Sequence, residues 1–189
     1  MNDPALDIQA QLLSARVEAE LSKPAVVMVT SARTGDSKSL TAYSLATSLE
    51  KYNHRVSLME IPNEEGASHE RLSAFVEKMR ANYDFTIIDA AAFVKSSAVM
   101  SLARLVDGIL LAVRIGRAPT DDDESMVLML EQVGGKIVGV VATDAGTIAN
   151  FERARGESPA LTRLQPRRNA EQNSAQALMA VIAAERVSR

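Results

Sequence analysis

The chain has 189 residues, with 21 Lys and Arg against 24 Asp and Glu, so its net charge of -3 lacks the basic excess that drives nucleic-acid binding. The absence of cysteine excludes disulfide frameworks, thiolate zinc sites and thiol catalysis, and the two histidines argue against a histidine metal site. Three Tyr, four Phe and no Trp are too few for a base-stacking platform. A chain of this length can bury a single core without covalent staples.

Neither a membrane span nor a secretory signal is visible. Apolar stretches such as residues 25–29 and 109–113 are five residues long, whereas a transmembrane helix needs about 20. The N-terminal sequence MNDPALDIQAQ has neither a positive segment nor an apolar core. We therefore expect a cytoplasmic protein.

Strand and helix patterns alternate along the chain after an amphipathic helix over residues 6–21. Five apolar, β-branched runs lie at 25–30, 55–61, 85–90, 108–114 and 136–143. Most are continuous rather than alternating, which is typical of strands buried on both faces. Helical periodicity lies between them, at 39–52, 68–82, 97–106 and 121–133. The alternation predicts an α/β layer fold with a parallel sheet and right-handed crossovers.

The last of these helices has a clear start. Thr120 is the expected N-cap, Asp123 follows three residues later, and acids fill the first turn, where they complement the helix dipole. The two histidines, His54 and His69, stand in polar contexts and are expected on the surface.

Three segments differ in character. Residues 1–23 form the N-terminal helix, residues 24–150 the main domain, and residues 151–189 a polar linker followed by a helix near 173–187. The last segment holds seven Arg and four Glu, so it is basic while the rest of the chain is acidic. We expect it to pack on the same domain.

The segment between the first strand and the next helix has the composition of a phosphate-binding loop. Its sequence, SARTGDSKS, places Lys38 and Ser39 where a P-loop carries the lysine that neutralises phosphate and the hydroxyl that binds Mg²⁺. The strict pattern GxxxxGK[ST] fails twice, because Ala32 and Ser37 stand at the glycine positions. The alternative is an ordinary first helical turn with solvated side chains.

Acidic residues end two of the other strands. Asp89 closes the run FTIID, as a Walker B carboxylate would, and Glu60 closes SLME. Ligands of open parallel sheets bind beyond the carboxyl ends of the strands, so both carboxylates are expected to face the same crevice as Lys38 and Ser39. A simple polar cap on a strand end is the alternative for each.

With these motifs the sequence resembles the cytoplasmic P-loop domain of bacterial tyrosine kinases and their exopolysaccharide chain-length-regulator relatives, within the Min/Par class of deviant-Walker ATPases. The resemblance covers about residues 24–144 and rests on SARTGDSKS, YDFTIIDAAAF and LARLVDGILLAVRIGRAPTDD. It implies a three-layer P-loop NTPase-type fold with a mostly parallel sheet of five or more strands. It also implies ATP or ADP with Mg²⁺ as cofactors.

The same resemblance implies partners and residue roles. The partner would be a membrane-embedded polysaccharide chain-length regulator, which could hold the protein at the inner membrane; no nucleic acid is expected, and we expect a monomer or homodimer. Lys38, Glu60 and Asp89 would be the catalytic residues, and Ser39 and Asp89 would hold Mg²⁺. The cofactor-binding residues would be Arg33, Thr34, Gly35, Asp36, Ser37, Lys38, Ser39 and Leu40.

Five positions depart from the family pattern. Ser37 replaces a glycine, and its Cβ costs about 1–2 kcal/mol if the loop needs a positive φ there. Arg33 stands at the signature lysine of Min/Par proteins, and Glu60 replaces an aspartate. Ala98 replaces a further aspartate, and Thr143 stands where an adenine-reading Asn is often found.

These departures leave three hypotheses. The leading one is a nucleotide-binding regulatory protein with weakened or lost catalysis; the others are a slow ATPase and a non-binding pseudo-NTPase that acts as an interaction subunit. No tyrosine follows Tyr83 in this sequence, so we do not expect autophosphorylation of a C-terminal tail.

Overall fold

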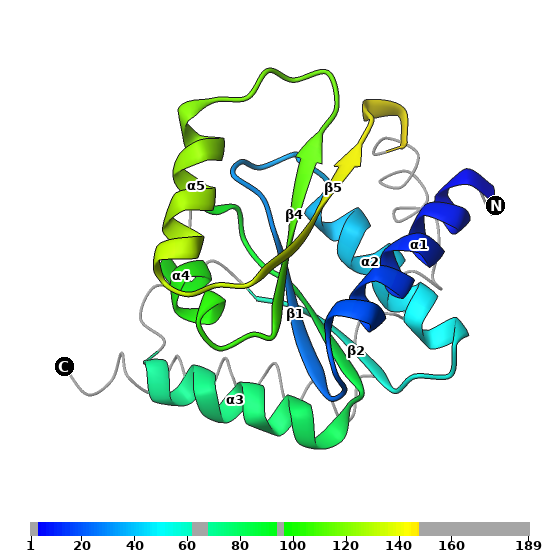
Figure 1. The fold of residues 1–189 in the computed structure, drawn as a ribbon, viewed down its shortest axis with the longest axis vertical. Helices are drawn as coiled ribbons and strands as arrows, with labels where there is room; N and C mark the ends of the chain where they lie inside the picture. Colours follow the sequence, from blue (N-terminus) through cyan, green and yellow to red (C-terminus); the bar gives the residue numbers. More distant parts are fainter. Residues whose placement is uncertain (1–3, 62–67, 94–96, 148–189) are drawn as a thin grey trace.

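The computed structural model describes residues 4–61, 68–93 and 97–147. Helices and strands alternate along the chain (Figure 1) in the order α1 (Pro4–Glu20), β1 (Ala25–Thr30), α2 (Lys38–Lys51), β2 (Val56–Glu60), α3 (His69–Asn82), β3 (Phe85–Asp89), α4 (Ser97–Ala103), β4 (Gly108–Arg114), α5 (Asp121–Gln132) and β5 (Ile137–Thr143). The predicted elements therefore occur in the predicted order. The main difference is α4, which ends at Ala103 rather than at residue 106.

The five strands form one sheet in the order β2-β3-β1-β4-β5, and every neighbouring pair is parallel. The predicted α/β fold with a parallel sheet flanked by helices is confirmed. β1 lies at the centre and all six of its residues are buried, which explains why its sequence is apolar without alternation.

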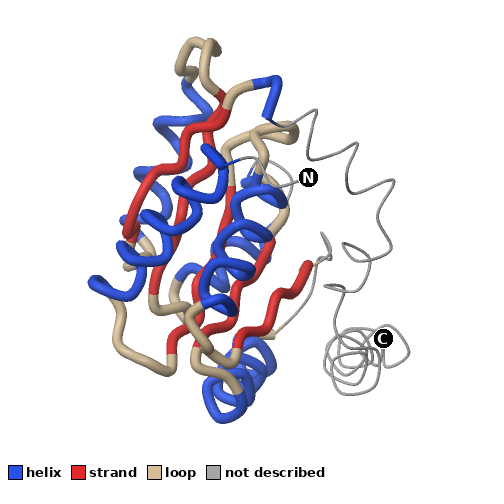
Figure 2. The backbone as a smooth tube through the Cα atoms, turned by 90° about the vertical axis from the view of Figure 1, so that its right-hand side faces the viewer, coloured by secondary structure: helices blue, strands red, loops and turns tan. Residues whose placement is uncertain are grey.

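Helices cover both faces of the sheet, and the strands lie between them in Figure 2. On one face, α1 and α2 pack their apolar residues against inward side chains of β1, β3 and β4; this cluster includes Val17, Leu45, Leu49, Phe85 and Ile87. On the other face α3, α4 and α5 pack around Leu72, Met79, Leu102, Met126 and Leu130. The domain thus has three layers, each helix burying one apolar stripe.

The chain path explains this distribution. From β1 the chain crosses over α2 to β2, two places away, and returns through α3 to β3 beside β1; it then passes to the other side of β1 through α4 and α5. Right-handed crossovers running in opposite directions along a sheet put their helices on opposite faces. The loop after β1 consequently lies at the carboxyl edge of the sheet, between the ends of β3 and β4.

His54 differs from its expected surface position. Its side chain is 11% exposed, because Glu18 and Lys23 hydrogen-bond its two ring nitrogens, Lys23 Nζ lying 3.0 Å from Nδ1. Its ring also meets Phe85 edge-on at 5.2 Å. His54 thereby joins the end of α1 to the sheet.

None of the helices within the described ranges is long and apolar enough to cross a bilayer. The predicted linker and helix over residues 151–189 lie outside the described residues.

Candidate functional site

The loop between β1 and α2 has a left-handed backbone at two positions. Gly35 has a φ of 88°, and Ser37, at the start of α2, has a φ of 61° and a ψ of 28°. Ser37 thus occupies the conformation that favours glycine. Asp36 between them has no positive φ, and backbones that alternate in hand in this way point successive N–H groups into an anion-binding hollow.

The strand register positions both predicted carboxylates at this loop. Asp89 on β3 pairs with Val29 on β1 and with Glu60 on β2, so the three residues lie side by side at the carboxyl edge. Side chains alternate along a strand, and Ile87 packs with α2, so Asp89 projects from the α2 face. Leu58 packs in the same cluster, which puts Glu60 on that face as well.

Lys38 and Ser39 form the first turn of α2 and are partly buried. The structure therefore brings all four predicted residues to one edge and one face of the sheet. Backbone hydrogen bonds fix the strand ends relative to the loop: Ala90 N donates to Val29 O at 3.0 Å, and Phe93 N donates to Ser31 O at 2.8 Å. Glu60 is exposed, whereas Asp89 is partly buried.

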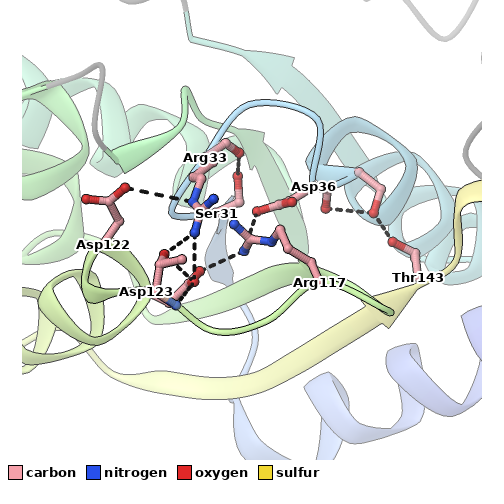
Figure 3. A network of polar contacts seen from close by, with 9 residues as sticks. Ser31, Arg33, Asp36, Arg117, Asp122, Asp123 and Thr143 are labelled. Carbon is pink, nitrogen blue, oxygen red and sulfur yellow. Dashed lines mark hydrogen bonds and ion pairs between the residues drawn. The ribbon is translucent and has the colours of Figure 1, made fainter.

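Arg33 points toward Asp122 and Asp123 at the start of α5 (Figure 3). Its Nη2 donates to Thr120 Oγ1 and lies 3.6 Å from Asp123 Oδ2, and its Nε lies 3.8 Å from Asp122 Oδ2. The predicted N-cap Thr120 also donates from its N and Oγ1 to Asp123 Oδ2, at 2.9 and 2.8 Å. The acidic first turn of α5 therefore binds an arginine of the loop as well as complementing the helix dipole.

A second arginine, Arg117, reaches the loop from the segment after β4. Its Nη2 donates to Asp123 Oδ1 at 2.8 Å and lies 3.1 Å from Asp36 Oδ2. Burial opposes ionisation of Asp123, but its hydrogen bonds from Thr120 and from Arg117 outweigh that cost and lower its pKa. The carboxylate of Asp123 is thus held in its charged form between the two arginines.

Thr143, at the end of β5, contacts the loop on its other side. Its hydroxyl hydrogen-bonds Ser37 Oγ, which also donates to the backbone oxygen of Asp36 at 2.6 Å. The residue at the position where the family often has an adenine-reading Asn therefore contacts the loop between β1 and α2. The side chain of Ala98 lies outside the described set.

In the described part of the chain, no three His, Cys, Asp or Glu side chains group closely enough to hold a metal ion. A Mg²⁺ site needs no such group, because Mg²⁺ is commonly held by one or two carboxylates, phosphate oxygens and water. Ser39 and Asp89, which share one face and edge, fit that kind of donor set.

Sequence reasoning missed Arg117 and the role of Asp36. The available signal was position: Arg117 follows β4, whose end lies next to β1 at the edge where the loop begins. Any charged residue after that strand is a candidate for contact with the loop.

Comparisons with known proteins bear on the fold of the chain. The chain is 28% identical over 150 residues to the succinoglycan biosynthesis transport protein ExoP of Rhizobium meliloti, covering 71% of this chain and 19% of ExoP. The fold matches the kinase domain of the Escherichia coli tyrosine kinase ETK with a TM-score of 0.58, 17% identity and 72% coverage of each chain. The chain is thus similar in sequence to a segment of ExoP and in fold to the kinase domain of a bacterial tyrosine kinase.

The fold is also similar to that of a cell division protein. The MinD cell division protein of Aquifex aeolicus matches with a TM-score of 0.53 and 18% identity, over 87% of this chain and 97% of MinD. No protein-family model matches the chain. Because the chain spans about a fifth of the length of ExoP, only the corresponding segment of that protein is compared.

Proposed function

We propose that the chain binds an adenine nucleotide with Mg²⁺ at the loop of residues 31–39. The observation that carries the proposal is the loop backbone, left-handed at Gly35 and Ser37, at the N-terminus of a helix that begins with Lys38 and Ser39. Backbone N–H groups and the positive end of the helix dipole favour a phosphate there.

Each residue has a distinct part in this site. Lys38 would neutralise the β-phosphate, and the Ser39 hydroxyl and Asp89 would hold Mg²⁺, which supplies charge neutralisation on the phosphate oxygens. Glu60 lies beside Asp89 at the solvent-exposed edge, where it would orient a water molecule if hydrolysis occurs.

We further propose a regulatory role beside a membrane-embedded polysaccharide chain-length regulator, with weakened catalysis. The similarity to ExoP supports the association with polysaccharide synthesis. Two features of the loop support the weakened catalysis: the Cβ of Ser37 at a left-handed position, and the engagement of Arg33 with α5. In this role the protein would be cytoplasmic, held at the membrane through its partner, and a monomer or homodimer.

Thermal unfolding with ADP and Mg²⁺ tests the site. A ligand present at 100 times its Kd stabilises the folded state by about 2.7 kcal/mol, a shift of roughly 5–10 °C for a chain of this size. Lys38→Ala should remove the shift. Lys78→Ala on the exposed side of α3 makes the same change away from the site and should retain it. Absence of a shift in the unchanged protein contradicts nucleotide binding.

Two other functions are favoured by specific observations. The exposed carboxylate of Glu60 beside Asp89 favours a slow ATPase, for which Glu60→Gln should abolish a measurable turnover while ADP binding is retained. The buried carboxylate of Asp36 within the loop favours a non-binding interaction subunit, because it opposes the approach of phosphate.

A further inference from the structure

The carboxylate of Asp36 is in an unusual place for a phosphate loop. The residue is 3% exposed and lies between the two left-handed residues Gly35 and Ser37. Its Oδ2 lies 3.1 Å from Nη2 of Arg117, which comes from the segment after β4. A buried carboxylate needs compensation, and the guanidinium of Arg117 supplies it.

This ion pair leaves hydrogen-bonding capacity unused. Asp36 Oδ2 and Arg117 Nη1 are both buried, and within the described residues neither has a partner in hydrogen-bond geometry. A carboxylate satisfies a guanidinium best when both of its oxygens meet two N–H groups, and a phosphate does so equally well. The contact with Asp36 is therefore a partial match for the arginine.

The arrangement holds Arg117 in place independently of Asp36. Its Nη2 also donates to Asp123 Oδ1 at 2.8 Å, and Asp123 is itself anchored by Thr120. Arg33 is less available, because it already contacts Thr120, Asp122 and Asp123. Of the two arginines, Arg117 is thus the better placed to exchange its carboxylate partner for a phosphate.

We propose that Arg117 binds phosphate at the nucleotide site formed by the loop of residues 31–39. While the nucleotide is absent, the carboxylate of Asp36 pairs with the Arg117 guanidinium as a competing anion. This inference rests on the proposed nucleotide site and adds a ligand from a second segment of the chain. Phosphate binding then exchanges one ion pair of Arg117 for another and moves the Asp36 side chain out of the loop. Nucleotide affinity is lowered by the strength of the pair that must be broken.

A double-mutant cycle on Mg²⁺–ADP affinity, measured by calorimetry, tests the exchange. Asp36→Asn should bind ADP about tenfold more tightly and Arg117→Gln about tenfold more weakly, the size of one hydrogen bond to a charged group. The gain from Asp36→Asn should vanish in the Arg117→Gln background. If the gain persists there, Asp36 acts through its charge alone and the inference is overturned.

Controls separate this inference from the proposed function. Asp121→Asn removes the same charge from an exposed position at the start of α5 and should leave affinity within about twofold. If Asp36→Asn fails to fold, Asp36→Ala repeats the test. Binding that is lost in Lys38→Ala but unaltered by changes at Asp36 and Arg117 overturns this inference alone. If neither the unchanged protein nor Asp36→Asn binds ADP, this inference and the proposed function are both overturned.

Discussion

Ser37 offers a direct test of the loop backbone. Its φ of 61° and ψ of 28° lie in the left-handed region, which costs a non-glycine residue about 1–2 kcal/mol. Ser37→Ala keeps this cost, whereas Ser37→Gly removes it. Glycine also adds freedom to the unfolded chain, worth about 0.4–1 kcal/mol in the opposite direction. The glycine variant should therefore be more stable than the alanine variant by about 1 kcal/mol.

Comparing Ser37→Ala with Ser37→Gly cancels the effect of losing the Ser37 hydroxyl. Both lose the hydrogen bonds of the Ser37 hydroxyl to Asp36 and Thr143, so the difference between them reports the backbone. Ser44, inside α2, is the matched control, because there glycine should be less stable than alanine by about 1 kcal/mol. The glycine-minus-alanine differences at the two positions should thus have opposite signs and differ by about 2 kcal/mol.

Urea unfolding followed by far-UV circular dichroism measures all four variants. Stability differences are taken from the midpoints where the slopes agree, and a difference in slope reports a change in the unfolded state. An alanine variant at position 37 that is as stable as the glycine variant would refute a left-handed backbone there. It would also remove the main structural argument for an anion-binding hollow in the loop.

Two further predictions concern stability. Leu45→Ala should destabilise the fold by about 2–5 kcal/mol in urea unfolding, because Leu45 is fully buried between α2 and the sheet, whereas Leu128→Ala on the exposed side of α5 should change stability by less than about 0.5 kcal/mol. Asp123 has a lowered pKa in the folded state, so its contribution to stability is complete above the unfolded pKa of about 3.9 and is lost as the pH falls through the folded value. The urea midpoint of Asp123→Asn should accordingly fall less between pH 5 and pH 2.5 than that of the unchanged protein; an equal fall would assign the acid sensitivity to other carboxylates.

Local patterns were sufficient for the fold because each element carries its own signal. A continuous apolar run predicts the fully buried β1, and Thr120 followed three residues later by Asp123 predicts the capped start of α5. The convergence of Lys38, Ser39 and Asp89 also follows from sequence, since the carboxyl ends of parallel strands share one edge. The partly buried His54 did not follow, because its burial depends on Glu18 and Lys23 from another segment.

The sequence by itself determined the order of elements, the parallel sheet and the place of the loop between β1 and α2, because spacing and hydrophobicity encode these within a few residues. Only the tertiary structure decided what the loop touches. Arg33 meets Thr120 across 87 positions of sequence, and Ser37 meets Thr143 across 106. No local pattern specifies such pairs. They arise because the strand order puts β4 beside β1 and β5 beside β4, so that residues after these strands meet the loop through tertiary packing rather than through sequence spacing.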